Sequence, residues 1–384
     1  MSPLQFETTP RIVCHAGGVK QLGQWACKLG VTHVLLVTDA GLHENGLTAT
    51  VLAALDSVAV KVSVFAEVQA DPPETCVQQA VEMARSVGAN GVVGFGGGSS
   101  LDTAKLVALM ACTPQALESI YGVGLARGPR FPLIQMPTTA GTGSEVTAVS
   151  VITTPSHEKK TVVSPLLLPD LALLDAELTI GLPPSITAMT GVDAMVHAIE
   201  AYTTRLKKNP LSDTLAIKAL QTLYTHLPTA VGDGQNFEAR EQMLFGSLLA
   251  GMAFANASVG AVHALAYPLG GHYHLPHGLS NSLVLPHVLR FNLPAAQTLY
   301  AAMGRAILPE LATADDPHAA AAFVQAVADR VASMPYAQTL NQAGIRQDDL
   351  PMLTQEAMKV QRLLDHNPRA LGYDDVLAIY QAAF

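Results

Sequence analysis

Four side chains in two segments have the types and spacing of metal ligands. Asp193 and His197 lie four residues apart in GVDAMVHAIEAY, and His263 and His277 lie in VHALAYPLGGHYHLPHG. Positions four apart share one face of a helix, so Asp193 and His197 can bind the same ion. Together the four offer one carboxylate oxygen and three imidazole nitrogens. The pattern predicts a metalloenzyme whose chemistry takes place at this ion.

The spacing leaves two questions about this site open. His272 and His274 share the second segment, so the local sequence does not choose among its histidines. A histidine in an apolar helix is also often a satisfied core residue, and we expect His277 to lie in a polar loop, LPHG. The donor set suits Fe(II) or Zn(II) and is too poor in oxygen for calcium or magnesium. The residues do not choose between iron and zinc.

A glycine-rich stretch, GFGGGSSLDTAK, connects a predicted strand at 91–97 with a predicted helix at 100–112. Successive glycines leave backbone N–H groups accessible, and a helix N-terminus favours an anion, so a phosphate can bind here. Ser99 and Ser100 add hydroxyl donors. The structural alternative is a tight turn between strand and helix, since this is not the usual G-x-G-x-x-G pattern.

A second loop strengthens the interpretation of a nucleotide site. PTTAGTGSEVT (137–147) follows a predicted strand at 132–139 and can donate hydroxyls and amides to a pyrophosphate, although it could also be a polar turn with an N-cap. Both loops follow predicted parallel strands, which is where open α/β sheets bind ligands. Asp39 ends another strand, at 33–39. A carboxylate there favours NAD over NADP by repelling a 2′-phosphate, or it caps the next turn.

The elements that must position these residues change in type near 180–184. Before it, strands alternate with helices, which is typical of a parallel sheet covered on both faces. The predicted strands are 33–39, 60–68, 91–97, 132–139, 149–154 and 172–179, and the helices are 76–88 and 100–112. After GLPP, helical stretches dominate, at 185–204, 213–227, 239–258, 318–334 and 374–383. We predict an α/β domain with a parallel sheet at 1–182 and an all-α domain at 183–384.

Composition excludes several classes of protein. The formal net charge of −9 and the absence of a basic stripe argue against nucleic acid as a partner. No apolar run is long enough for a membrane span, and the N-terminus lacks the pattern of a secretory signal. Four scattered cysteines without a CxxC pair are typical of reduced thiols. We therefore expect a cytoplasmic protein.

Three motifs together carry a family resemblance: GGGSSLDTAK, PTTAGTGSEVT, and GVDAMVHAIEAY with VHALAYPLGGHYHLPHG. The chain resembles the iron-containing (group III) alcohol dehydrogenase family nearly from end to end. The resemblance implies a Rossmann-like, dinucleotide-binding N-terminal domain, a helical metal-binding C-terminal domain and an active site between them. It also implies a homo-oligomer, a dimer or larger.

The resemblance also implies roles for individual residues. The metal ligands fall on Asp193, His197, His263 and His277. The aromatic residue that narrows the substrate pocket in some members falls on Phe254. The implied cofactor contacts are Gly97, Gly98, Ser99, Asp102, Thr138, Thr139, Thr142, Thr147 and Lys160, to which the strand pattern adds Asp39.

One position departs from the family pattern. Many members carry a histidine where this chain has Tyr267, and that histidine relays protons or positions substrate. The reference pKa of tyrosine is about 10, against about 6.5 for histidine. We therefore expect the relay to differ here and name Tyr267 and His274 as its candidate catalytic residues.

The implied reaction is reversible hydride transfer between a small primary or secondary alcohol and NAD, with the metal as Lewis acid. Other activities on this scaffold remain open, namely hydroxyacid–oxoacid transhydrogenation, maleylacetate reduction and glycerol oxidation. A dehydroquinate-synthase-like lyase is a further alternative, but it depends on a basic pocket for a phosphorylated substrate. Lys160 and a few scattered arginines are the only basic residues evident for that purpose. A non-catalytic metal and nucleotide binder is the last alternative.

Overall fold

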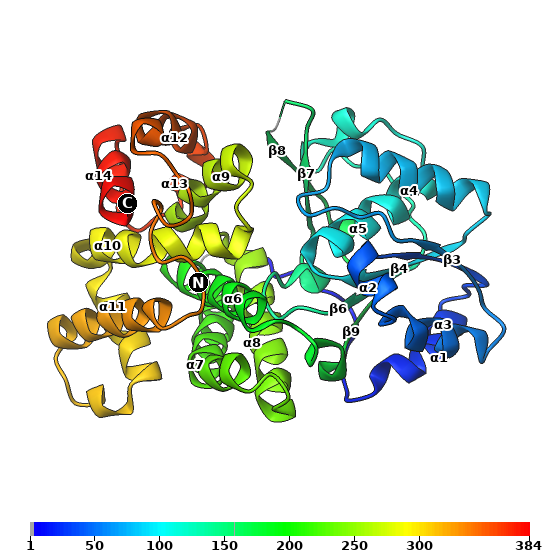
Figure 1. The fold of residues 1–384 in the computed structure, drawn as a ribbon, viewed down its shortest axis with the longest axis horizontal. Coiled ribbons are helices and arrows are strands. Elements are labelled where there is room, and N and C mark those ends of the chain that lie inside the picture. The colour runs from blue at the N-terminus through cyan, green and yellow to red at the C-terminus, as the bar shows by residue number, and fades with distance from the viewer. Residues whose placement is uncertain (1–3, 157) are drawn as a thin grey trace. The chain divides into compact units, whose positions relative to one another are not determined.

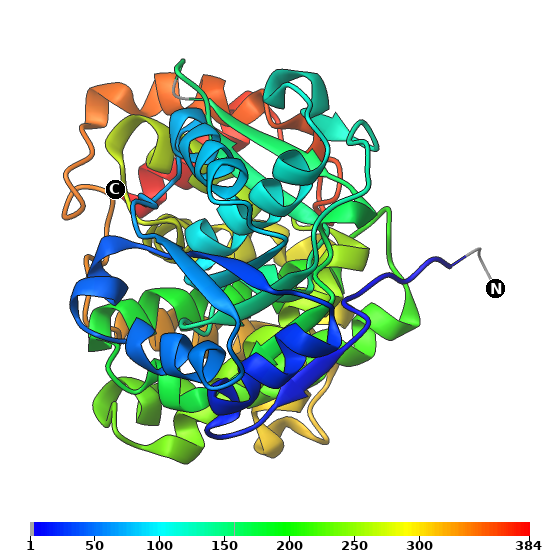
Figure 2. The same ribbon diagram turned by 90° about the vertical axis from the view of Figure 1, so that its right-hand side faces the viewer.

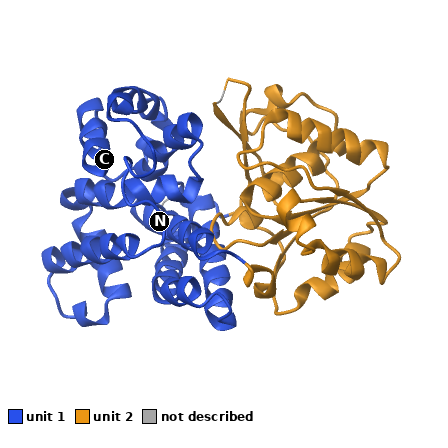
Figure 3. Ribbon diagram, in the orientation of Figure 1, with its two compact units in different colours: residues 1–6, 182–384 blue, residues 7–181 orange. Residues whose placement is uncertain are grey.

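The computed structural model describes residues 4–156 and 158–384, and the chain divides into two compact units (Figure 3). The first, Glu7–Gly181, is called the α/β unit. The second, called the helical unit, comprises Leu182–Phe384 with the described part of residues 1–6.

A sheet of six parallel strands forms the centre of the α/β unit (Figure 1). The order of the strands across the sheet is β1-β9-β6-β4-β2-β3. The strands are β1 (Ile12–Cys14), β2 (His33–Val37), β3 (Lys61–Phe65), β4 (Gly91–Gly96), β6 (Leu133–Pro137) and β9 (Leu171–Leu174). The parallel sheet predicted from the alternation of strands and helices is therefore confirmed.

Helices cover both faces of this sheet (Figure 2). Side chains of β2 alternate between two cores: Leu35 and Val37 pack with the helices α4 (Glu74–Ser86) and α5 (Gly98–Cys112). Val34 and Leu36 pack on the other side, with α1 (Leu22–Lys28) and α3 (Thr48–Asp56). Because successive side chains of a strand point to opposite faces, a strand apolar at every position needs a layer of helices on each side.

Two predicted strands differ from the structure in detail. The strand expected at 149–154 is β7 (Val149–Thr153), which pairs antiparallel with β8 (Lys159–Val163) in a small separate sheet that also contains β5 (Gly122–Val123). The strand expected at 172–179 ends at Leu174, and Ala176–Thr179 forms a 3₁₀ turn. The carboxylate of Asp175 accepts a hydrogen bond from the Glu177 N–H, and this cap starts the turn.

The helical unit consists of helices and connecting loops in all its described residues. Its helices are α6 (Pro184–Thr203), α7 (Pro210–Gly232), α8 (Phe237–Ala257), α9 (Ala261–Tyr273), α10 (His277–Ile307), α11 (Asp316–Ala332), α12 (Leu350–Met358), α13 (Gln361–Leu364) and α14 (Tyr373–Ala383). Asn209 and Asn236 cap α7 and α8 by accepting hydrogen bonds from the N–H groups of Ser212 and Ala239. The prediction of a helical second half is confirmed.

Helix α10 is the main element that the sequence analysis missed. It runs for 31 residues and contains Pro286 and Pro294, which interrupt helical patterns because proline lacks an N–H donor. The prediction that His277 lies in a loop is wrong, since His277 is the first residue of this helix and follows Pro276.

Among the described residues, no helix taken singly combines the length and apolar character needed to cross a membrane. One bent pair, α8 with α9, meets those two criteria when its members are joined.

Candidate metal centre

Helix α6 supplies two of the four predicted metal ligands. Asp193 and His197 lie in its middle and are 2% and 4% exposed. Bulk water therefore does not compete with the partners of either side chain. The helix begins at Pro184, a residue suited to the first helical turn because its missing N–H would have no intrahelical partner there. The four-residue spacing therefore places an oxygen and an imidazole on one buried face, as the sequence predicts.

The other two ligands come from the first turns of two further helices. His263 is the third residue of α9 and His277 the first of α10. One ligand atom from each of Asp193, His197, His263 and His277 lies within 4.8 Å of all the others. The Nε2 atoms of His263 and His197 are 3.1 Å apart, and the His277 Nε2 lies 3.7 Å from the Asp193 Oδ1. We call these four residues the metal cluster.

The surroundings of Asp193 favour its ionised form. Burial by itself would raise the pKa of Asp193, but the imidazoles of His197, His277 and His263 outweigh it and lower the pKa overall. The amide Nδ2 of Asn281 donates to the Asp193 Oδ1 at 2.6 Å and also lies within 3.3 Å of the Nε2 atoms of His263 and His277. The Asn281 amide therefore lies at the point where the Asp193 oxygen and the two imidazole nitrogens meet. A carboxylate and three imidazoles at these separations fit a single Fe(II) or Zn(II) ion.

Sequence reasoning missed two residues that contact the cluster. Glu200 bonds the Nδ1 of His263 through its Oε2 at 2.6 Å, and Asn281 makes the contacts just described. Both carry a spacing signal, since Glu200 lies seven positions after Asp193 and Asn281 four positions after His277. Positions i, i+4 and i+7 share one helical face, so a search for polar residues on the ligand face finds both.

Phe254 and Tyr267 lie against the cluster, whereas His274 occupies a helix end. The Phe254 ring stacks on His197 with centroids 4.3 Å apart, and the Tyr267 ring lies 6.2 Å from that of His277. His274 is exposed and caps the C-terminus of α9 in the left-handed conformation, with φ 53°. His272 is also exposed, and neither His272 nor His274 belongs to the cluster.

The predicted phosphate loop of the α/β unit joins β4 to α5. Gly96 has φ 147°, which strongly favours glycine, and a Cβ on it would lie 2.6 Å from the Ser100 hydroxyl. Gly97 is the N-cap of α5 and provides no side-chain cap, so the first N–H groups of the helix, from Gly98 and Ser99 onward, lack that partner. This is the arrangement that helix N-termini use to bind phosphate.

The second predicted loop meets the first. A Cβ on Gly98 would lie 2.8 Å from the side chain of Thr142, and the Thr138 N–H donates to the Gly96 carbonyl at 3.0 Å. Thr139 lies beside Gly97, and a Cβ on that glycine would be 3.6 Å from the threonine hydroxyl. The structure thus brings the threonines at 138, 139 and 142 next to the glycine turn.

A buried lysine holds the two loops together. Lys105, fully buried on α5, donates to the Ser144 hydroxyl at 2.8 Å, to the Thr147 hydroxyl at 3.1 Å and to the Val149 carbonyl at 2.6 Å. It also pairs with Asp102 at 3.2 Å. Asp102 and Thr147 were predicted as cofactor contacts, and in this structure both bond within the loop network.

Two further predicted cofactor contacts lie at the surface of the α/β unit. The Oδ1 of Asp39 accepts a hydrogen bond from the Leu42 N–H at 3.0 Å, so Asp39 caps α2 (Ala40–Glu44). The capping role given as an alternative is therefore observed, and the ribose role stays a prediction. Lys160 on β8 has a side chain 46% exposed and pairs with Glu158 at 2.8 Å.

Family models match both halves of the chain. Residues 9–176 match the model described as iron-containing alcohol dehydrogenase. Residues 187–384 match the model described as the Fe-containing alcohol dehydrogenase family, C-terminal. The two matches include both loops and all four residues of the metal cluster.

Whole-length relatives agree with these models. The chain is 39% identical over 379 residues to a probable alcohol dehydrogenase, EutG, of Salmonella typhimurium, covering 98% of this chain and 94% of that one. It is 33% identical over 379 residues to an NAD-dependent methanol dehydrogenase of Bacillus methanolicus, covering 98% and 99%. The crystal structure of a 1,3-propanediol oxidoreductase matches with a TM-score of 0.95 at 33% identity, over 100% of both chains.

Proposed function

The chain belongs to the iron-containing alcohol dehydrogenase family and is an oxidoreductase of alcohols, and from this premise we propose that it transfers hydride between small alcohols and NAD at the metal cluster. The observation that carries the proposal is the convergence of one carboxylate oxygen and three imidazole nitrogens within 4.8 Å. Primary and secondary alcohols, with the corresponding aldehydes and ketones, are the proposed substrates.

The four residues of the metal cluster would hold Fe(II) or Zn(II). When bound, such an ion supplies Lewis acidity, which lowers the pKa of an alcohol O–H and polarises the carbonyl of the product. Asp193 would contribute the negative charge that retains the ion, and the burial of Asp193, His197 and His263 would keep competing water away from their ligand atoms, whereas His277 is partly exposed. The stacked Phe254 ring covers one side of His197 and gives this part of the site an apolar wall suited to an alkyl chain.

NAD as the hydride acceptor is supported by features of the α/β unit. When bound, NAD accepts the hydride at its nicotinamide ring. The uncapped N-terminus of α5 offers N–H groups to a pyrophosphate, and Gly98 allows Thr142 to approach that turn closely. Asp39 at the end of the β2 segment adds a negative charge that disfavours a 2′-phosphate. A relative of this chain is named as NAD-dependent.

Tyr267 is the proposed proton-relay residue near the metal cluster. Its ring lies 6.2 Å from the His277 ring, in the position where many family members carry histidine. We expect Tyr267→Phe to lower kcat by about a hundredfold, the loss typical of a removed acid–base group, without changing metal content. An unchanged kcat would leave His274 as the remaining candidate.

The test of the proposed function is a substrate panel with defined metal content. Protein loaded separately with Fe(II) and Zn(II) is offered small primary and secondary alcohols with NAD or NADP, and NADH formation is followed. We expect NADH with at least one alcohol, loss of turnover on chelation and recovery on adding metal back. Turnover that survives metal removal, or no reduced cofactor with any alcohol, would contradict the proposal.

A further inference from the structure

Glu200 is a buried carboxylate on the same helical face as two of the proposed metal ligands. It follows His197 by three positions and Asp193 by seven, which is the i, i+4, i+7 series of one face of α6. The residue is 6% exposed, and it is not among the four groups of the metal cluster. A buried carboxylate requires partners for both oxygens, so its contacts reveal its role.

Both oxygens of Glu200 bond the first turn of α9. The Oε1 accepts a hydrogen bond from the Val262 N–H at 2.7 Å, and the Oε2 lies 2.6 Å from the Nδ1 of His263. The N-cap residue of α9 is Gly260, which has no side chain to cap the helix. A carboxylate from α6 therefore takes the place of that cap, where the positive end of the helix dipole also favours it.

This contact decides which nitrogen of His263 can bind a metal. An ionised carboxylate only accepts hydrogen bonds, so the proton of a neutral His263 ring must sit on Nδ1. The Nε2 lone pair is then directed away from Glu200, and that atom lies 3.1 Å from the His197 Nε2 and 4.0 Å from the Asp193 Oδ1. The same bond fixes the orientation of the ring.

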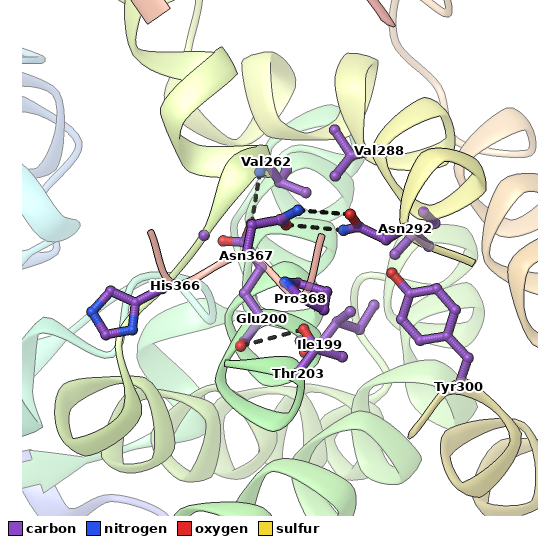
Figure 4. Close-up of a pocket in the computed structure, with 12 residues that line it drawn as sticks. Ile199, Glu200, Thr203, Val262, Val288, Asn292, Tyr300, His366, Asn367 and Pro368 are labelled. Atoms are coloured by element: carbon purple, nitrogen blue, oxygen red, sulfur yellow. Dashed lines mark hydrogen bonds between the residues drawn. The ribbon is translucent and has the colours of Figure 1, made fainter. Parts of the chain in front are cut away.

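The surroundings of Glu200 leave His263 as the side chain that its Oε2 contacts. Glu200 and Val262 line a small pocket together with Asn292, Tyr300 and Asn367 (Figure 4). Asn292 and Asn367 exchange two hydrogen bonds, of 2.9 and 2.7 Å, so these amides satisfy each other. No lysine or arginine among the described residues lines this pocket. The imidazole of His366 does line it, but its Nδ1 bonds the Thr204 hydroxyl at 2.8 Å, and His263 is the side chain that the Glu200 Oε2 contacts. Glu200 therefore acts on the His263 ring through this contact.

We propose that Glu200 is the positioning residue of the metal centre, which fixes His263 in the Nδ1-protonated form and ties the N-terminus of α9 to α6 so that Nε2 faces the other ligands. This inference rests on the metal cluster of the proposed function and adds a residue to it. A carboxylate that bonds a ligating imidazole orients the ring and raises its basicity, and losing such a partner typically costs about 10- to 100-fold in metal affinity.

Glu200→Gln tests the inference most directly, because it keeps the shape of the side chain and replaces one acceptor oxygen by an NH₂ donor. If the amide oxygen faces the Val262 N–H, the amide NH₂ faces the His263 Nδ1 and forces the ring proton onto Nε2, which then cannot bind metal. If the amide is turned round, two N–H donors oppose each other at Val262. Either arrangement weakens the site, so we expect the metal dissociation constant, measured by chelator competition, to rise about 10- to 100-fold.

Asp315→Asn is the matched control. Asp315 caps α11 by accepting a hydrogen bond from the His318 N–H at 2.9 Å, so this change also replaces a carboxylate by an amide at a helix N-terminus in the same unit. We expect its metal affinity to stay within about twofold of wild type, because no proposed ligand contacts it. Equal affinities for Glu200→Gln and wild type would overturn the inference.

A second measurement reads the ring proton in the wild-type protein itself. In metal-free wild-type protein with ¹⁵N-labelled histidine, at a pH where the ring is neutral, the nitrogen chemical shifts report which atom carries the proton. The His263 signals are assigned by their loss in His263→Ala. Protonation at Nδ1 is expected, and protonation at Nε2 would overturn the inference. Both measurements omit alcohol and NAD, so a failure of alcohol oxidation would count against the proposed function alone.

Discussion

The metal cluster of the helical unit and the loop network of the α/β unit are both buried groups of polar side chains, but their hydrogen-bonding balance is opposite. In the cluster, ligand atoms of Asp193, His197, His263 and His277 approach within 4.8 Å of one another, and each can offer a lone pair to a cation. In the network, the ammonium of Lys105 contacts four acceptors, and each is also fixed by the fold. The first group is the proposed site of a cation, whereas the second already contains one.

This difference distinguishes a proposed binding site, the metal cluster, from a structural network, the contacts of Lys105. Converging lone pairs have a cost that a bound cation relieves, and the Nδ2 of Asn281 lies within hydrogen-bond distance of three of the four groups. In the Lys105 network the ammonium supplies the donors, and we expect this network to hold the two loops while their backbone N–H groups stay available. The metal cluster and the Lys105 network both consist of polar side chains that are mostly buried. The internal cation distinguishes the network from the cluster.

Removing the internal cation of the network should give the largest effect on stability. Lys105→Met leaves the Asp102 carboxylate and the Ser144 and Thr147 hydroxyls without their shared donor. We expect the free energy of unfolding to fall by about 3–5 kcal/mol, the cost typical of breaking a buried ion pair. Chemical denaturation measures this loss, with the exposed Lys61→Met on β3 as control. A loss no larger than that of the control would mean that the network does not hold the loops.

The pH dependence of stability tests the same region through Glu145, which lies in the second loop. Burial raises the pKa of its carboxyl from 4.5 to about 7, although its own backbone N–H and the Lys105 charge oppose the change. Because the folded-state pKa is the higher one, this contribution to stability is complete below pH 4.5 and is lost as the pH rises through about 7. The wild type should lose about 3 kcal/mol relative to Glu145→Gln over that range. Parallel pH profiles would contradict this.

A smaller effect is expected at Asp39, where charge and capping can be separated. Asp39→Ser keeps a side-chain cap for α2 but removes the negative charge, whereas Asp39→Gly removes both. Both variants should raise the NADP to NAD ratio of kcat/KM by about tenfold, equivalent to about 1.4 kcal/mol. An unchanged ratio in both would limit Asp39 to its capping role.

The sequence predicts the architecture well where a single periodicity dominates. The strands β2, β4 and β6 appear close to the expected ranges because each is a short, continuous apolar run followed by polar or glycine residues. The helices α4 to α8 do so because they are longer stretches without strong breakers at their centres. It fails where local signals compete. Pro286 and Pro294 interrupt the helical pattern of α10, so the sequence does not indicate a helix there. The partner of β7 depends on strand pairing that no local pattern encodes.

The proposed metal ligands are easier to predict from the sequence than the residues that position them. Asp193 and His197 are visible because four-residue spacing has a direct geometric meaning in a helix. The choice of His263 and His277 over His272 and His274 depends on where α9 ends and α10 begins, which residue types alone do not fix. Glu200 acts on a different helix, so its role becomes visible only once α6 and α9 are packed together.

Metal stoichiometry of three proteins tests the central claim most directly. Wild type, His263→Ala and His318→Ala are equilibrated with Fe(II) or Zn(II), freed of excess ion and analysed for bound metal. His318 is an exposed residue of α11 outside the metal cluster and serves as the matched control. The account predicts one ion per chain in wild type and in His318→Ala, and little or none in His263→Ala. Full metal content in His263→Ala would contradict it.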